Sequence, residues 1–240
     1  MLRLRLASMF VLASISACGG GGGSDANSGH ADAAPDGPLG PGSNNLLVEG
    51  TFVVQNPNNL SVGSSLMVFC DLRISKAGAP VADAVVIVNP APPAFQAVLT
   101  GDEVDLGHYR GTYFAYADTA RLTVTTLAHD YINEAVLVGP KLFQIEMPQM
   151  GVGVPPTSPL HVSWGQPGGA VDWADVALES GFSMTDLPDN GSYDIPAASL
   201  VPGEDTAQVT RWSHDVIPGA APGSYIDFGI HDSQPFSVVN

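Results

Sequence analysis

The sequence is poor in positive charge and in cysteine. Its 240 residues contain 8 Lys+Arg against 24 Asp+Glu, a formal net charge of −16, and only 2 Cys. Phosphate recognition requires a basic patch, so this balance argues against a nucleic-acid partner. The hydrophobic fraction of 45% is large enough for a buried core, and the length allows one large domain or two of about 100 residues each.

Helical periodicity and the motifs of familiar enzyme classes are also missing. No segment sustains a helical apolar period, and there is no Gly-x-Ser-x-Gly, no His-Glu-x-x-His and no cysteine pair for zinc. The glycine run at 19–23 has no strand before it, as a phosphate-binding loop requires. We therefore expect a non-enzymatic protein, with calcium as the one cofactor to consider.

The first 18 residues have the organisation of an export signal. A basic start at Met1–Arg5 precedes an apolar run, Leu6–Ile15, that is shorter than the roughly 20 residues a transmembrane helix needs. The tetrapeptide Ile15-Ser16-Ala17-Cys18 resembles a bacterial lipobox. The resemblance implies that residues 1–17 are a signal peptide and that Cys18 carries a lipid. The alternative is an ordinary secretory signal.

Residues 18–45 predict a disordered tether. Gly19–Gly23 and the following Ser, Asp, Ala, Pro and Asn residues bury too little apolar surface to order the chain. By the lipobox resemblance, Gly19 in place of the Asp that retains some lipoproteins at the inner membrane favours the outer membrane. We therefore expect an outer-membrane lipoprotein, facing the periplasm or the cell surface, whose lipid makes the membrane a partner.

From Leu46 onward the pattern predicts short strands separated by turns. Ser65–Ser75 alternates apolar and polar residues, which is the period of a strand with one buried face and places Cys70 inside. Pro148–Pro159 reads as a linker between two sets of strands, so we expect an all-β chain with domains at 46–147 and 148–240. The other expected strands are Val81–Val88, Arg110–Ala117, Arg121–Leu127, Ala135–Val138, Leu142–Met147, Leu160–Trp164, Val176–Leu178, Tyr193–Ile195, Gln208–His214, Tyr225–Ile230 and Phe236–Val239.

A short pattern, Asp-x-Gly-x-Tyr, occurs at Asp105–Tyr109 and again at Asp189–Tyr193. It resembles the tyrosine corner of immunoglobulin-type domains, and the resemblance implies two tandem Ig-like or fibronectin-like antiparallel β-sandwiches. The family's cysteine two residues past the Tyr is replaced by Gly111 and Ile195, so its disulfide is absent. The alternative is an ordinary turn before a Tyr-bearing strand.

Acidic residues are concentrated in the second expected domain, where 11 acids face a single base, Arg211. Clustered loop carboxylates are the ligands that Ca²⁺ prefers, which makes Asp186, Asp189 and Asp194 candidate calcium ligands. The alternative is a solvated acidic surface that keeps the protein soluble.

Trp173, between Asp172 and Asp175, is the candidate for ligand binding, whereas Trp164 reads as a core residue. An exposed indole stacks on the apolar face of a sugar while neighbouring acids accept hydroxyl bonds. The first hypothesis is an envelope protein with an interaction or structural role, its ligand a protein or polysaccharide. The alternative is a carbohydrate-binding module at Trp173. A third hypothesis is a glycosidase using a carboxylate pair such as Asp172 with Asp175 or Asp186 with Asp189.

Overall fold

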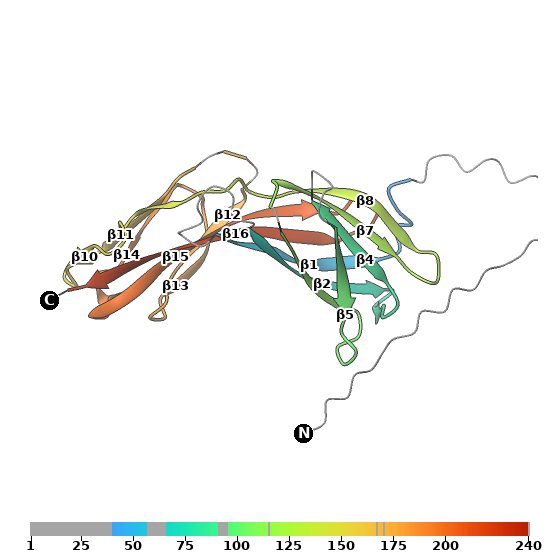
Figure 1. Cartoon of the computed structure of the whole chain (residues 1–240), viewed down its shortest axis with the longest axis horizontal. Coiled ribbons are helices and arrows are strands. Elements are labelled where there is room, and N and C mark those ends of the chain that lie inside the picture. The colour runs from blue at the N-terminus through green and yellow to red at the C-terminus, as the bar shows by residue number, and fades with distance from the viewer. Residues whose placement is uncertain are drawn as a thin grey trace, which may run out of the picture. The chain divides into compact units, whose positions relative to one another are not determined.

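A computed structural model describes residues 40–56, 66–90, 96–114, 116–166, 168–169 and 171–239. The chain divides into two units, Met1–Gly37 and Pro38–Asn240. The expected signal peptide, Cys18 and most of the expected tether lie outside the described residues. Across the described ranges no helix is long and apolar enough to cross a membrane, and the sole helical element is a 3₁₀ turn at Ala197–Ser199. The prediction of an all-β fold is confirmed (Figure 1).

Within the described residues, thirteen strands form one large sheet in the order β13-β12-β15-β16-β1-β2-β6-β5-β4-β7-β8, with β10 paired to β16 and β3 to β2. A separate small sheet has the order β14-β11-β9. The strands are β1 (Leu47–Asn56), β2 (Met67–Lys76), β3 (Ala79–Pro80), β4 (Val85–Pro90), β5 (Ala97–Gly101), β6 (His108–Phe114), β7 (Thr119–Thr125), β8 (Tyr131–Val138), β9 (Ile145–Met147), β10 (Gly153–Val154), β11 (Leu160–Trp164), β12 (Trp173–Leu178), β13 (Ser183–Leu187), β14 (Ser192–Ile195), β15 (Gly203–Val216) and β16 (Tyr225–Val238).

Alternation of apolar and polar residues decides which face of each strand is buried. In β2 the residues Val68, Cys70, Leu72 and Ile74 are buried while their neighbours are not, which confirms the strand expected at Ser65–Ser75. β11 coincides with the expected Leu160–Trp164, with Trp164 buried and His161 exposed. β1 and β5 were not among the expected strands, although β1 buries Val48, Phe52 and Val54 by the same alternation.

The large sheet turns back on itself at β5, which pairs with β6 on one side and β4 on the other. The strands β4, β7 and β8 thereby share one apolar core with β1, β2 and β6. β15 and β16 are 14 residues each and pair along their whole length. The first part of β16 also pairs in parallel with β1, from Glu49 opposite Tyr225 to Asn56 opposite Asp232.

The two expected domains therefore contribute to one continuous sheet. Strands from both sides of the expected boundary at residue 147 are hydrogen-bonded to each other through β1 and β16. The segment expected as a linker contains β10, which pairs with the end of β16. At the other end, the backbone of Ser43 bonds to Tyr131 and that of Asn44 to Gly219, so the folded unit begins before Leu46.

The two Asp-x-Gly-x-Tyr patterns occupy turns before strands β6 and β14. Gly107 and Gly191 have φ of +79° and +80°, values that favour glycine because it lacks a Cβ. The Tyr109 hydroxyl donates to the Val81 carbonyl at 2.9 Å and accepts from the Ala84 amide at 2.9 Å. This hydroxyl therefore bonds to backbone upstream, as in the resemblance, but to a segment 28 residues away along the chain.

Candidate functional site: an aromatic row across the large sheet

The strands of the large sheet have one face toward the core and an opposite face that we call the outer face. Strand register aligns one residue from each of six neighbouring strands across this face, since cross-strand partners point the same way. We call this set the aromatic row: Trp173, Trp212, Gly229, Val53, Phe69 and Thr112.

Trp173 and Trp212 are stacked at the start of the row. Their ring centroids are 6.0 Å apart and their planes differ by 15°, and both side chains are half-buried. The six-membered ring of Trp212 fills the space above Gly229, where an added Cβ would lie 2.6 Å from Cζ3. Glycine at 229 therefore makes room for the indole to lie on the sheet. Trp173 is the first residue of β12.

Asp175 holds Trp212 in this position. Its Oδ2 accepts a hydrogen bond from the indole Nε1 at 2.8 Å, and its Oδ1 accepts one from the Asp186 amide at 3.0 Å. Both carboxylate oxygens of Asp175 are thus engaged within the protein. The acid that the sequence analysis assigned to sugar hydroxyls is placed to orient the aromatic ring.

Asp172 joins the tryptophan pair to a second ring stack. Its amide donates to the Trp212 carbonyl at 2.8 Å, and its Oδ2 accepts from the His214 amide at 2.7 Å. The His214 ring stacks on Tyr225 with centroids 5.0 Å apart, and its Nδ1 lies 2.7 Å from Asp227 Oδ1. These contacts make one connected surface of rings and carboxylates over β12, β15 and β16.

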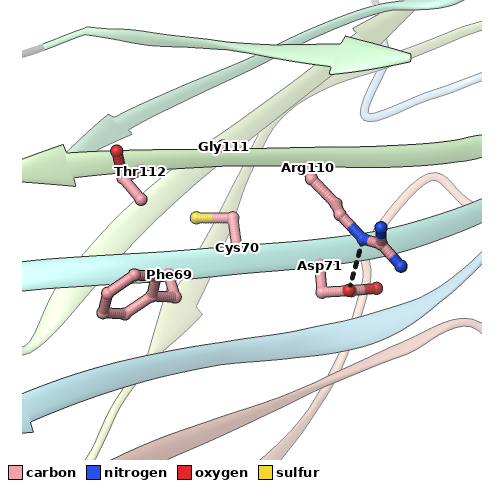
Figure 2. Close-up of a pocket in the computed structure, with 6 residues that line it drawn as sticks. All are labelled: Phe69, Cys70, Asp71, Arg110, Gly111 and Thr112. Atoms are coloured by element: carbon pink, nitrogen blue, oxygen red, sulfur yellow. Dashed lines mark hydrogen bonds and ion pairs between the residues drawn. The ribbon is translucent and has the colours of Figure 1, made fainter. Parts of the chain in front are cut away.

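The far end of the row borders a hollow of about 350 Å³ lined by Phe69, Cys70, Asp71, Arg110, Gly111 and Thr112. Phe69 is 38% exposed on the outer face. Arg110 Nε donates to Asp71 Oδ2 at 3.0 Å, and Figure 2 shows this pair bridging the neighbouring strands β2 and β6.

His108 lies beside the hollow, and both of its ring nitrogens are hydrogen-bonded to carboxylates of the protein. Its Nε2 is 2.5 Å from Asp71 Oδ1 and its Nδ1 is 3.0 Å from Asp105 Oδ2. Hydrogen bonds from Arg73 and from His108 lower the pKa of Asp105 to about 2. Since both ring nitrogens already have carboxylate partners, His108 has no free nitrogen with which to act as a general base.

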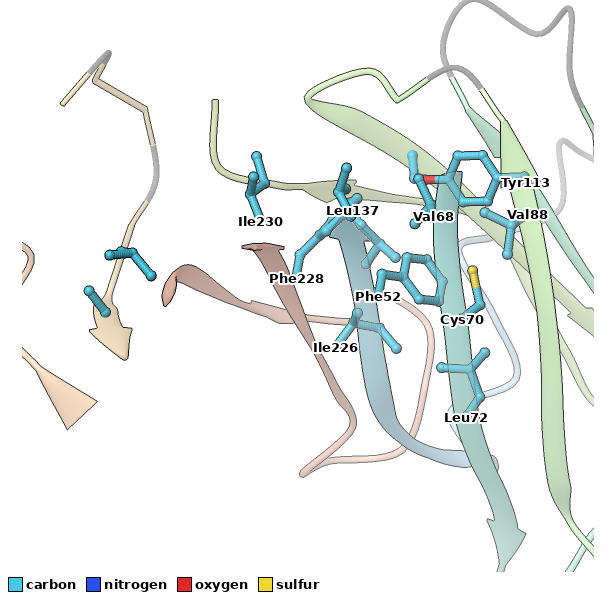
Figure 3. Close-up of a cluster of buried hydrophobic side chains, with 14 of the residues drawn as sticks. Phe52, Val68, Cys70, Leu72, Val88, Tyr113, Leu137, Ile226, Phe228 and Ile230 are labelled. Atoms are coloured by element: carbon cyan, nitrogen blue, oxygen red, sulfur yellow. The ribbon is translucent and has the colours of Figure 1, made fainter. Parts of the chain in front are cut away.

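Cys70 lies behind the hollow with its thiol in the apolar core, among side chains such as Phe52 and Leu72 (Figure 3). It is 3% exposed and unpaired, which confirms the expected inward register. Burial raises the pKa of the thiol, so the reactive thiolate is disfavoured. Cys70 is a packing residue.

The three candidate calcium ligands have separate partners. Asp194 pairs with His161 at 2.7 Å, and Asp189 accepts from Trp164 Nε1 at 2.8 Å and from Arg211 Nη2 at 2.6 Å. Asp186 has a φ of +56° and donates its amide to Asp175. In the described part of the chain, no three or more His, Cys, Asp or Glu side chains gather as a metal would require.

Two buried charged residues behind the outer face, Arg211 and Asp232, were not predicted from the sequence. Arg211 is 2% exposed, bonded to Asp189 and placed with its guanidinium 5.4 Å from the Phe143 ring centroid. Asp232 is fully buried; its Oδ2 accepts from the Ile145 amide at 2.8 Å, and burial raises its pKa to about 6. Arg211 occupies a core position in the alternation of β15, which is the signal that could have revealed it.

No family model matches the chain, and no curated protein matches it. Among solved structures, the chain is similar to the Yersinia pseudotuberculosis adhesin InvE, with 14% identity and a TM-score of 0.24. The match covers 78% of this chain and 60% of the adhesin chain. A likeness at this TM-score carries no argument about function.

Proposed function

We propose that the protein is a non-enzymatic, lipid-anchored protein of the bacterial cell envelope that binds a ligand on the outer face of its large sheet. The lipobox at Ile15–Cys18 supports the anchor and the outer-membrane location. The carboxylates considered for catalysis support a binding role, since Asp175 and Asp189 accept hydrogen bonds from within the protein.

The ligand class favoured by the outer face is a polysaccharide. The observation that carries this proposal is the stacked pair Trp173 and Trp212, half-buried on an open sheet face and fixed by Asp175. Aromatic rings present a flat apolar surface that fits the apolar face of a sugar ring, and a pre-positioned ring loses little conformational entropy on binding.

The test is glycan binding by the full-length, detergent-solubilised protein. Trp173→Ala is expected to weaken binding at least tenfold while leaving the melting temperature nearly unchanged, because this ring begins a strand and is only half-buried. Leu127→Ala is the control, since Leu127 is an 82% exposed apolar side chain in the turn between β7 and β8, outside the aromatic row and its flanks. Equal affinities for the wild type and Trp173→Ala would refute the assignment.

The location is tested separately by replacing Cys18. Cys18→Ala removes the expected acylation site, so labelled fatty acid that the wild type incorporates should be absent from the variant. Protease treatment of intact and lysed cells then distinguishes a surface orientation from a periplasmic one. Equal incorporation of labelled fatty acid by the wild type and Cys18→Ala would contradict the lipid anchor.

We also propose that the fold consists of two Ig-like sandwiches fused through the shared strands β15 and β16. The repeated turn before β6 and β14 supports two modules, and the β1–β16 ladder supports their fusion. Calorimetric melting should then show one cooperative transition, because neither half keeps its sheet without the other. Two separate transitions would indicate independent domains.

A further inference from the structure

The aromatic row continues well beyond the tryptophan pair. Strands in a sheet lie about 4.8 Å apart, so the three strand spacings from Trp212 to Phe69 measure about 14 Å, and the five from Trp173 to Thr112 about 24 Å. This length corresponds to several sugar residues of an extended chain. A ligand aligned with the row crosses the strands instead of running along them.

Large rings stand at one end of the row and next to its other end, and small groups lie between them. Gly229 has no side chain and is buried beneath Trp212, and Val53 is a small half-buried residue. The far ring, Phe69, lies between Val53 and Thr112 in the register and borders the hollow. The row therefore has two aromatic positions, separated by the small residues Gly229 and Val53.

Hydrogen-bonding groups flank the row on both sides. On one side the register aligns Asp227, Thr51, Asp71 and Arg110. On the other side it aligns Thr210, His231 and Gln55, with Thr210 Oγ1 3.0 Å from His231 Nδ1, and then the apolar Met67 and Phe114 beside Phe69. Polar groups beside an aromatic track suit a ligand whose edges carry hydroxyls and whose faces are apolar.

The charges of this face select against an anionic ligand. The row carries no ionisable side chain, and its flank contains the carboxylates Asp227 and Asp71. The basic side chains beside it, Arg110 and Arg73, are ion-paired with Asp71 and Asp105. With a net charge of −16 on the whole chain, an acidic polymer meets repulsion that an uncharged one does not.

We propose that the aromatic row binds an extended, uncharged polysaccharide lying across the strands, with Trp173–Trp212 and Phe69 as two separate stacking subsites. This inference rests on the proposed function and adds the charge class of the ligand, its direction on the sheet and a second subsite. Phe69 then contributes only to ligands long enough to reach it from the tryptophan pair.

The test is calorimetric titration of the full-length, detergent-solubilised protein with cello-oligosaccharides and chito-oligosaccharides of increasing length. Affinity should rise with length until the ligand spans both subsites. Phe69→Ala should remove that gain, by about five- to tenfold for a spanning ligand, and leave short ligands unaffected. Trp173→Ala should weaken short and long ligands alike. Leu127→Ala, the control outside the row and its flanks, should keep both affinities.

The outcomes separate this inference from the proposed function. If Trp173→Ala weakens binding and Phe69→Ala does not at any length, the second subsite is wrong while the tryptophan site stands. If an oligogalacturonate of the same length binds as tightly as the uncharged ligands, the charge class is wrong. If the wild type binds no oligosaccharide, the proposed carbohydrate function itself is wrong.

Discussion

The two halves of the molecule enclose their cores by different means. Around β1, β2 and β6 the second layer is part of the same sheet, because β5 hydrogen-bonds to both β6 and β4. Among the described residues, the small sheet of β9, β11 and β14 has no strand ladder to the large sheet. It is joined to it by side chains instead: Asp189 to Arg211 and Asp232 to the Ile145 amide.

The buried polar residues hold the two sheets of the second core in a fixed orientation. The first core, around Phe52, Val68 and Leu72, is apolar, and continuity of the backbone ladder keeps its layers together. The second needs specific bonds between layers, because hydrophobic contact alone does not fix how two unconnected sheets are oriented. Buried charge pairs add such specificity, although their net stabilisation is small when both partners are present.

The largest expected loss of folding stability comes from breaking the Arg211–Asp189 pair. Arg211→Ala leaves the Asp189 carboxylate in a mostly buried place without its cation, which should destabilise the fold by about 3–5 kcal/mol in denaturant unfolding. The control is Arg121→Ala, whose ion pair with Glu134 is about half exposed and should contribute at most about 1 kcal/mol. Similar losses for both variants would mean that burial of the Arg211 pair is unimportant.

The next effect concerns pH and Asp232. Because burial raises the pKa of this carboxyl from 3.8 in the unfolded chain to about 6, the folded state holds its proton more tightly. This pKa shift lowers the free energy of unfolding by at most about 3 kcal/mol. The loss is absent below pH 4, grows between pH 4 and 6, and is complete above pH 6. Asp232→Asn should therefore be the more stable protein at pH 7, with a smaller advantage at pH 4.5. A constant difference across this range would contradict the assignment.

A smaller loss of folding stability is expected from removing the Tyr109 hydroxyl, which lies near the first core. Tyr109→Phe removes a hydroxyl that bonds both Val81 and Ala84, and should cost about 1–2 kcal/mol in the same unfolding assay. The change should leave glycan binding intact, because Tyr109 points toward the core and not toward the outer face. A loss of binding without a loss of stability would require a different role for Tyr109.

The smallest effect is expected from calcium. Asp189 and Asp194 are bonded to Arg211 and His161 and are not gathered around one point, so millimolar Ca²⁺ and EDTA should give the same melting temperature. A clear rise with Ca²⁺ would show that the carboxylates can rearrange around the ion.

Strands whose faces follow from the alternation of neighbouring residues could be predicted from the sequence. The alternation around Cys70 predicted β2 and its buried face, and the β11 strand was correct to the residue. Pairings between distant segments were out of reach, since β1 and β16 join residues from opposite ends of the folded unit. For the same reason the stacking of Trp173 on Trp212 could not be predicted, because only the β12–β15 register brings the two rings together.

The central place of β1 has a mechanical consequence. It is the first strand of the folded unit, and it is hydrogen-bonded along one edge to β2 and along the other to β16. A pull on the N-terminal segment is therefore carried as shear along two ladders at once, so many hydrogen bonds must break together. If the N-terminus is held at a membrane and the outer face binds a polymer, a force between these two points acts on the central strands of the sheet. The edge strands then carry little of it.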